Sequence, residues 1–218
     1  MPPLRAAGQL VGGGNAAAAR WTGAYWKRGC MRIFVAVNFP ARLRQKIARL
    51  SRPLEEAGVP GQWTEADKVH LTLKFIGEVP AAEVDPISGA LEEVAGSFRP
   101  FEMKFGPIGA FPSPRRPRVV WLGVESTPEL RFIKDDRERR LAELGIPREE
   151  RPYQPHVTLG RAPREAEAGE FRRLEEVARS LRVTDVYRVT HLDLMKSQLG
   201  SGGAVHTRLV AARMGPRA

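Results

Sequence analysis

The chain lacks the features that disulfide-rich and membrane-spanning proteins require. Cys30 is its only cysteine, so no disulfide can form within its 218 residues. No stretch approaches the roughly 18 consecutive apolar residues of a membrane-spanning helix. The hydrophobic (42%) and charged (28%) fractions are ordinary for a globular protein. We therefore expect a cytoplasmic protein in a reducing compartment, with no membrane partner.

Lysine is also scarce, although the chain is strongly basic. Arginine accounts for 28 of the 35 basic residues, and the formal net charge is +10. Because the planar guanidinium group matches phosphate geometry, this balance favours a polyanionic partner such as RNA. A GC-rich genome would produce the same arginine excess, so composition by itself does not decide between the two explanations.

Residues 1–30 contain no acidic residue, a triple glycine and a run of four alanines. They lack the apolar core of about 7–15 residues that a secretory signal needs. We expect this segment to be a disordered extension or an artefact of the start site, because residues 31–37 already show a clean strand pattern. Residues 31–218 are then expected to form one bilobal domain.

Strand and helix patterns alternate from Met31 onward. The expected strands cover residues 31–37, 70–76, 101–105, 118–124, 187–194 and 204–211, with one more directly after Pro155. The expected helices run from Pro40 to Leu50, from Asp85 to Val94, from Thr127 to Leu144, and between residues 166 and 181, with Asp85 and Thr127 as N-caps. This order predicts an α+β fold of two pseudo-symmetric lobes, each an antiparallel sheet with helices on its outer face, around a central cleft.

One short pattern, His-aliphatic-Thr-aliphatic, occurs twice, 86 residues apart. Its two copies are His70-Leu71-Thr72-Leu73 and His156-Val157-Thr158-Leu159. Because successive side chains of a strand point to opposite faces, the histidine and threonine of each copy share one face and the aliphatic residues share the other. A surface histidine and threonine without function would explain one copy. Two copies in the same register predict one site built from two halves.

Paired imidazoles and hydroxyls suit phosphodiester chemistry. A neutral imidazole can accept a proton from an attacking oxygen while a protonated one donates a proton to the leaving oxygen. The hydroxyls of Thr72 and Thr158 can donate hydrogen bonds to the non-bridging oxygens of a phosphate. The doubled motif therefore predicts acid–base catalysis by two histidines.

Other catalytic chemistries find little support in the sequence. A metal site would need further ligands at recognisable spacing, but threonine follows two positions after each motif histidine, and neither HExxH nor CxxC occurs. There is no G-x-S-x-G nucleophile elbow, and the glycine-rich residues 200–203 lack the lysine of a phosphate-binding loop. We expect no metal and no cofactor.

Two basic residues close to the motifs have open assignments. Lys74 continues the alternation of His70 and Thr72, so it either reaches the same cleft or ends the strand in solvent. Strict alternation turns Arg161 away from the face of His156, unless Gly160 hosts a β-bulge that redirects it.

Four ring-bearing residues outside the motifs are also ambiguous. Trp63 and Tyr153 can stack a nucleobase, although packing in the core is the commoner fate of such residues. His191 and His206 stand outside any repeated pattern, and we expect structural or surface roles for both.

The two motifs resemble the 2H phosphoesterase superfamily and, more narrowly, the RNA 2′,3′-cyclic phosphodiesterases once called 2′-5′ RNA ligases. The narrower resemblance is carried by residues 31–37, 70–78, 109–112, 151–159 and 194–197. It implies the bilobal α+β fold and metal-free hydrolysis of RNA 2′,3′-cyclic phosphate ends to 2′-phosphates. It also implies that the partner is an RNA with such an end, tRNA fragments included. We expect the protein to act as a monomer.

The resemblance also implies a role for each motif residue. His70 would donate a proton to the 3′ leaving oxygen, and His156 would accept a proton from water. Thr72, Thr158 and Arg161 would bind the phosphate. Three alternatives stay open: 2′-5′ ligation in the reverse direction, hydrolysis of a small cyclic nucleotide, and a basic RNA-binding module without catalysis.

Overall fold

The computed structural model describes residues 29–200 and 203–215. Most of the expected N-terminal extension, residues 1–28, lies outside the described residues, as do residues 201 and 202 of the glycine-rich stretch. The first strand begins at Cys30, one residue before the expected start. No helix in the described ranges is long and apolar enough to cross a membrane.

Within these ranges the strands form one curved antiparallel sheet in the order β7-β4-β5-β6-β3-β1-β8-β9, with β2 paired to β6. The strands are β1 (Cys30–Asn38), β2 (Gln62–Trp63), β3 (His70–Pro80), β4 (Phe101–Phe111), β5 (Val119–Val124), β6 (His156–Arg161), β7 (Val186–Val189), β8 (His191–Gly200) and β9 (Gly203–Arg213). The helices are α1 (Ala41–Ala48), α2 (Ser51–Glu56), α3 (Val84–Ser97), α4 (Pro128–Glu143) and α5 (Leu174–Ser180), with short turns η2 (Ala66–Lys68), η3 (Ala81–Glu83) and η4 (Ala168–Phe171).

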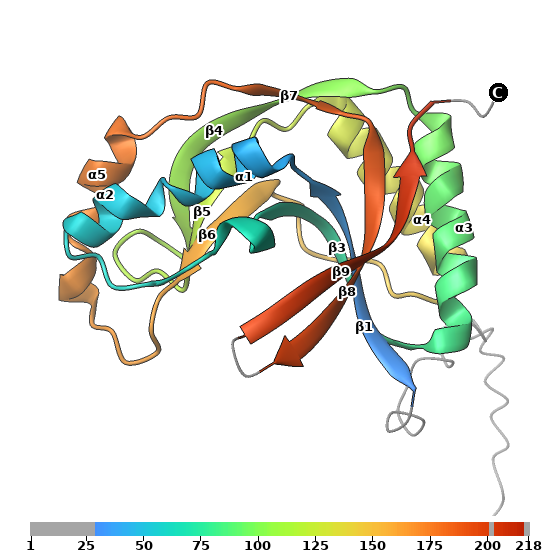
Figure 1. Cartoon of the computed structure of the whole chain (residues 1–218), viewed down its shortest axis with the longest axis horizontal. Helices are drawn as coiled ribbons and strands as arrows, with labels where there is room; N and C mark the ends of the chain where they lie inside the picture. Colours follow the sequence, from blue (N-terminus) through green and yellow to red (C-terminus); the bar gives the residue numbers. More distant parts are fainter. Residues whose placement is uncertain (1–28, 201–202, 216–218) are drawn as a thin grey trace, which may run out of the picture.

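The sheet divides into two lobes that meet between β3 and β6. One lobe contains β7, β4, β5 and β6, with α1, α2 and α5 on its side of the molecule; the other contains β3, β1, β8 and β9, with α3 and α4 (Figure 1). Every strand pair within the described residues is antiparallel. This arrangement confirms the predicted α+β fold of two lobes with antiparallel sheets.

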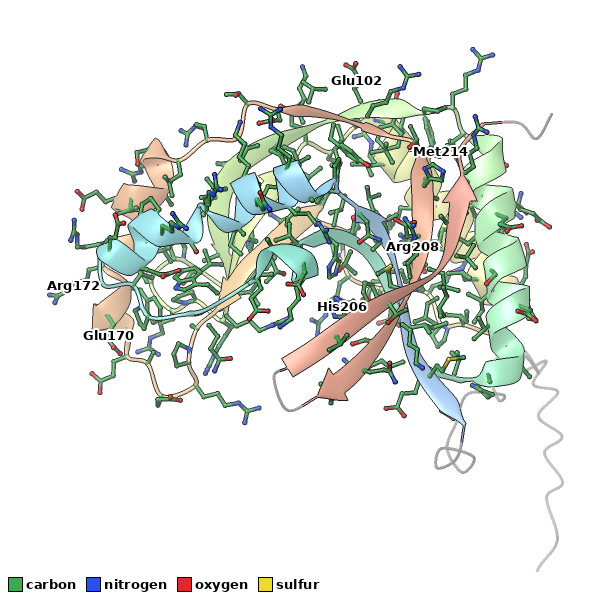
Figure 2. The ribbon with its side chains drawn as sticks, in the orientation of Figure 1. Glu102, Glu170, Arg172, His206, Arg208 and Met214 are labelled. Carbon is green, nitrogen blue, oxygen red and sulfur yellow. The ribbon has the colours of Figure 1, made fainter. Side chains whose placement is uncertain are left out.

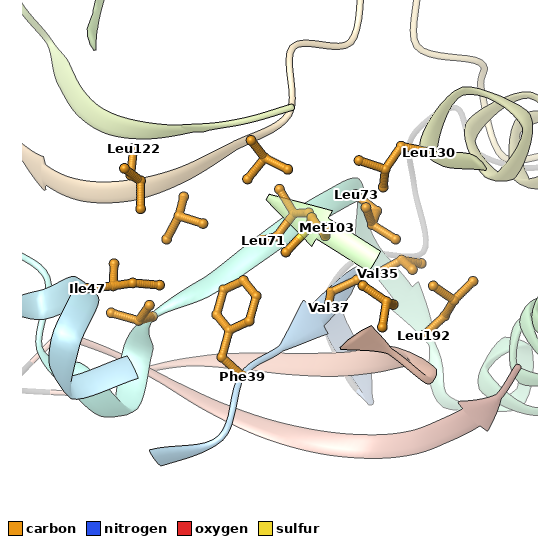
Figure 3. Close-up of a cluster of buried hydrophobic side chains, with 14 of the residues drawn as sticks. Val35, Val37, Phe39, Ile47, Leu71, Leu73, Met103, Leu122, Leu130 and Leu192 are labelled. Carbon is orange, nitrogen blue, oxygen red and sulfur yellow. The ribbon is translucent and has the colours of Figure 1, made fainter. Parts of the chain in front are cut away.

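The aliphatic residues of both motifs belong to the main hydrophobic core, in which Figure 3 labels Leu71 and Leu73. Leu71 and Val157 are fully buried, and Leu73 and Leu159 are nearly so. Burying each such side chain contributes about 1.5–3 kcal/mol to folding. The strands that carry the motifs are therefore held in place by their own aliphatic faces.

Local signals predict the helix starts unequally well. Thr127 caps α4 as expected, accepting a hydrogen bond from the Leu130 amide at 3.3 Å. The expected N-cap at Asp85 is wrong, because η3 precedes α3 and Glu83 occupies the cap position. The single helix expected between residues 166 and 181 is divided into η4 and the shorter α5.

Several strands differ in extent from those that the sequence predicted. β3 continues beyond Gly77 to Pro80. Gly77 lies next to an irregularity in the pairing with β1 and adopts a positive φ of 97°, which glycine allows without strain. β4 includes Pro107, which falls in a gap in the pairing with β5 and so has no ladder bond to lose there. The strand expected over residues 187–194 is interrupted at Thr190, where the chain leaves β7 for β8.

Candidate active site

The two motifs meet at their second residues. Leu71 of β3 pairs with Val157 of β6 in an antiparallel register. Carried one residue in each direction, this register sets His70 beside Thr158 and Thr72 beside His156. All four polar residues are half-buried. The structure therefore brings both copies together on one face, related by a pseudo-two-fold axis through the Leu71–Val157 pair.

A β-bulge follows the threonine in each motif. In β3, Thr72 pairs with Ala36 but Lys74 pairs with Val35, so Leu73 is an extra residue. The same shift occurs in β6, where Thr158 pairs with Trp121 and Gly160 pairs with Val120. After each bulge the alternation of faces is reversed, and the fifth residue after each motif histidine points to the cleft side.

The bulge in β3 turns Lys74 away from the cleft, and its side chain is buried rather than solvated, so both expected assignments of Lys74 are wrong. Its ammonium group is buried and donates to both carboxylate oxygens of Glu138, at 2.7 and 3.0 Å, and to the Pro147 carbonyl at 3.0 Å. Burial alone would raise the pKa of the Glu138 carboxyl. The hydrogen bonds from Lys74 and the Glu149 amide, together with the charge of Arg137, outweigh that effect and lower it. Lys74 is thus part of a buried ion cluster that joins β3 to α4.

Strict alternation allows Arg161 to face the cleft only if β6 contains a bulge near Gly160, and β6 contains that bulge. Arg161 is exposed and lines the same cleft as His70 and Thr158. Gly160, one residue earlier, is covered by Trp63: a Cβ atom there would lie 2.5 Å from the indole ring. Trp63 also lines the cleft while packing against the core, so its two expected roles are compatible.

Both motif histidines are held in the same tautomer. Nδ1 of His70 lies 2.8 Å from the Lys68 carbonyl oxygen, and Nδ1 of His156 lies 2.8 Å from the Gln154 carbonyl oxygen. A carbonyl can only accept, so each Nδ1 carries the proton in the neutral ring and Nε2 keeps its lone pair. Nε2 is therefore the atom that can exchange protons with a ligand in both halves.

The surroundings of the two imidazoles differ. The His70 ring lies 5.0 Å from Phe34 and 5.1 Å from His206, between ring centroids, whereas the His156 ring lies 5.1 Å from Phe111. Burial lowers the pKa of His70 to about 4; the Lys68 carbonyl opposes this shift and the nearby His206 adds to it. His70 is consequently neutral at pH 7 in the unliganded protein.

A cleft of about 450 Å³ lies over the first motif. It is lined by His70, Thr72, Thr158 and Arg161, and also by Arg32, Phe34, Trp63, Lys68, Phe75, Leu199 and His206, among others. His156 is not among the lining residues. It precedes Thr158 by two positions on the same face of β6, so it stands just beyond this cleft.

The structure also places the remaining candidates. Tyr153 is no base platform: it is largely buried, its hydroxyl donates to the Thr72 carbonyl at 3.0 Å, and burial raises its pKa. His191 is exposed on β8, outside the cleft. His206, which Figure 2 labels on β9, lines the cleft, although the sequence indicated a structural or surface role for it. Burial alternates along this part of β9 and leaves His206 half-buried, but nothing in the local sequence reveals that its face meets His70.

Ligands for a metal ion do not gather at this site. Within residues 29–200 and 203–215, no group of three or more His, Cys, Asp or Glu side chains is placed to hold a metal ion. The arrangement offers instead two Nε2 atoms, two hydroxyl groups and the Arg161 guanidinium group on one face of the sheet. These groups can move protons and bind an anion.

Comparison with known proteins finds the same duplication. A sequence model described as "LigT like Phosphoesterase" matches the chain twice, over residues 37–121 and 122–206, and each match contains one motif. The RNA 2′,3′-cyclic phosphodiesterase of Methanothermobacter thermautotrophicus is 31% identical over 188 residues, covering 84% of this chain and 99% of the relative. The enzyme of the same name from Archaeoglobus fulgidus is 38% identical over 135 residues, covering 62% and 74%.

Solved structures share the fold across both lobes. The crystal structure of TT0787 from Thermus thermophilus has a TM-score of 0.70 at 25% sequence identity, covering 86% of this chain and 100% of that one. E. coli LigT complexed with 3′-AMP has a TM-score of 0.64 at 28% identity, covering 85% and 98%. The similarity therefore includes the strands that carry both motifs.

Proposed function

The chain belongs to the LigT-like phosphoesterase family, and on that premise we propose that it hydrolyses the 2′,3′-cyclic phosphate at RNA ends to a 2′-phosphate. The observation that carries this proposal is the antiparallel pairing of the two motifs at Leu71 and Val157. It gathers two imidazoles and two hydroxyls, and each imidazole is held through Nδ1. Relatives named RNA 2′,3′-cyclic phosphodiesterase support the choice of substrate.

In the proposed reaction, two histidines move two protons in opposite directions. Nε2 of His156 accepts a proton from water as the water oxygen attacks phosphorus. The bond between phosphorus and O3′ breaks, and Nε2 of His70 donates a proton to O3′. The products are a 3′-hydroxyl and a 2′-phosphate. Solvent then removes the proton from His156 and returns one to His70.

The threonines and Arg161 would stabilise the charge that builds on the phosphate. Thr72 and Thr158 carry neutral hydroxyl donors, which suit the non-bridging oxygens. The Arg161 guanidinium group adds a positive charge on the same side of the cleft. In a partly desolvated site, such preorganised donors stabilise the transition state more strongly than they would in water.

His70 has to be protonated before it can act as the acid. Its lowered pKa in the unliganded protein means that the proton is taken up with the substrate. The negative charge of a bound cyclic phosphate, a few ångströms from the imidazole, favours the charged ring and raises the pKa. Substrate binding and activation of the acid are therefore coupled in this proposal.

The first test compares histidine variants. His70→Ala and His156→Ala should each lower the turnover of an oligonucleotide with a 2′,3′-cyclic phosphate by about 10²–10⁴-fold, with EDTA present. His191→Ala, which removes the exposed histidine of β8, should behave as wild type. Full activity in both motif variants, or RNA binding without turnover by the wild type, would refute the proposal.

A sulfur substitution separates the two roles. With sulfur in place of O3′, the leaving group is a thiolate, which departs without a proton far more readily than an alkoxide because a thiol has a pKa of about 8.5. The His70→Ala variant should regain most of its lost rate on this substrate, and His156→Ala should not. Rescue of the His156 variant instead would reverse the assignment of donor and acceptor.

A further inference from the structure

A row of three polar side chains crosses β1, β8 and β9 on the cleft side of the sheet. Arg32 of β1 pairs with Ser197 of β8, and Ser197 pairs with His206 of β9. All three residues line the cleft. Directly opposite residues of antiparallel strands share one face, with Cβ atoms about 4.5–5.5 Å apart. The guanidinium, hydroxyl and imidazole groups are therefore close enough to contact one ligand.

Ring contacts place this row beside the first motif. The His206 ring, labelled in Figure 2, lies 5.1 Å from the ring of His70 and 5.1 Å from that of Phe34, between centroids. Nδ1 of His206 is buried and has no hydrogen-bond partner in the described part of the chain. Nε2 is therefore the atom of this ring that can bind a ligand in the cleft. The row adjoins the imidazole that is proposed to donate the proton.

The charges in the cleft also favour an anion at this row. Of the three Lys and Arg side chains that line the cleft, Lys68 is paired with Glu65 at 2.8 Å. Within residues 29–200 and 203–215, no carboxylate lies within 4.0 Å of Arg32 or Arg161; Glu78 stands opposite Arg32 on β3 but does not line the cleft. β3 lies between the strands of the two arginines. The cleft thus has two unpaired cations, one on each side of the first motif.

An RNA end carries two anions that suit this arrangement. Its terminal nucleotide has the cyclic phosphate on O2′ and O3′ and the phosphodiester of the chain on O5′, one sugar away. With the cyclic phosphate at Thr158 and Arg161, as proposed, the other charge that this nucleotide brings is the phosphodiester. A guanidinium group matches phosphate oxygens with two parallel donors, and hydroxyl and imidazole groups also contact phosphate.

Resting on the proposed function, we infer that Arg32, Ser197 and His206 form a second anion subsite, which binds the phosphodiester on the 5′ side of the terminal nucleotide. Contacts to phosphate position a nucleic acid without reading its sequence, so the subsite does not choose among bases. It favours an RNA end over a nucleoside cyclic phosphate, because the nucleoside has no phosphate on O5′.

The test removes one charge from the substrate and leaves the reacting group, sugars and bases unchanged. One substrate is adenylyl-adenosine 2′,3′-cyclic phosphate with the natural linkage, and the other has an uncharged methylphosphonate linkage. Wild type should prefer the natural linkage by roughly 10–100-fold in kcat/KM, as expected for hydrogen bonds to a charged group. Arg32→Gln should remove most of this preference, mainly through KM, and leave turnover of the methylphosphonate unchanged.

Two further variants complete the comparison. Ser197→Ala should reduce the preference by roughly 2–10-fold, because it removes a single hydroxyl donor. Arg188→Gln removes the same charge as Arg32→Gln from an exposed position of β7 outside the cleft, and it should keep the wild-type preference. In wild type, log KM should rise with log salt more steeply for the natural linkage, by a slope of about 0.7 for one phosphate contact. Arg32→Gln should abolish this difference.

Three results would overturn the subsite. They are equal turnover of both linkages by wild type, an equal loss on both substrates in Arg32→Gln, and the same loss of preference in Arg188→Gln, which would assign the preference to net charge. Calorimetric binding of the two dinucleotides as 2′-phosphates decides the same question without turnover. A protein that hydrolyses neither substrate but loses affinity for the charged dinucleotide in Arg32→Gln would refute the proposed function and keep the subsite.

Discussion

Mild acid should destabilise this protein through His70. The pKa of its imidazole is about 4 in the folded protein, against an ordinary value of 6.5, because burial disfavours the charged ring. Below pH 6.5 the imidazole therefore binds a proton in the unfolded chain but stays unprotonated in the folded protein. The contribution of the neutral His70 ring to the free energy of unfolding is fully present above pH 6.5 and is lost as the pH falls toward 4.

The size of the effect follows from the two pKa values. A difference of 2.5 units corresponds to about 3 kcal/mol once the pH is below 4, and at pH 5 the loss is already about 2 kcal/mol. Burial also lowers the pKa of His206, which adds to the loss in the same direction. For a domain of this kind, such a loss is a sizeable part of the total stability.

Urea unfolding at pH 7 and pH 5 measures this loss. His70→Gln removes the titrating group and keeps a neutral polar side chain near the Lys68 carbonyl, so its stability should fall less between the two pH values, by about 2 kcal/mol. His191→Gln, which changes an exposed histidine, should match the wild type. Identical pH dependence in wild type and His70→Gln, or an NMR titration of the His70 ring near pH 6.5, would refute the burial argument.

Three further predictions concern the bulges and their neighbours. Gly160→Ala places a methyl group against Trp63 and should lower stability by about 1–3 kcal/mol, with a rise in KM, measured by thermal unfolding and steady-state kinetics. Lys74→Met should cost about 3–5 kcal/mol in urea unfolding because Glu138 loses its main partner, and Glu138→Gln in the same chain should recover part of it. Arg161→Ala should raise KM for the cyclic phosphate by roughly 10–100-fold and leave the melting temperature unchanged, because its guanidinium group is exposed.

Local patterns were sufficient for much of the fold. Period-2 alternation predicted the face of each motif residue, and Thr127, as an N-cap, predicted the start of α4. These features depend on a few neighbouring residues, so they can be read from the sequence. The doubled motif likewise predicted one site built from two halves, but it did not predict that the two motif strands pair directly within one sheet.

The bulges explain where local reasoning ended. Alternation assumes one residue per pairing position. The single extra residue at Leu73 was therefore enough to turn Lys74 into the protein interior and Phe75 toward the cleft. A glycine suggested the equivalent bulge in β6, but no glycine marks the one in β3. Contacts between distant segments were equally hidden. Glu138 lies 64 residues from Lys74, and His206 reaches His70 only because β9, β8, β1 and β3 are neighbours in the sheet.

The duplicated frame gives both histidines the same orientation, so any division of labour must come from their neighbours. A backbone carbonyl two residues earlier holds each Nδ1, which makes the two imidazoles equivalent by sequence and by tautomer. Only His70 is packed between Phe34 and His206, and its burial there lowers its pKa, so the ring is neutral when no anion is bound. If His70 is the donor, as proposed, the unliganded protein holds this histidine in its unprotonated form. The negative charge of the bound phosphate then raises the pKa of His70, so the substrate itself promotes protonation of the acid that it needs. Turnover that depends on His70 should therefore fall as the pH rises above the pKa of His70 in the complex, whereas the thiolate reaction, which needs no proton from His70, should not show this fall.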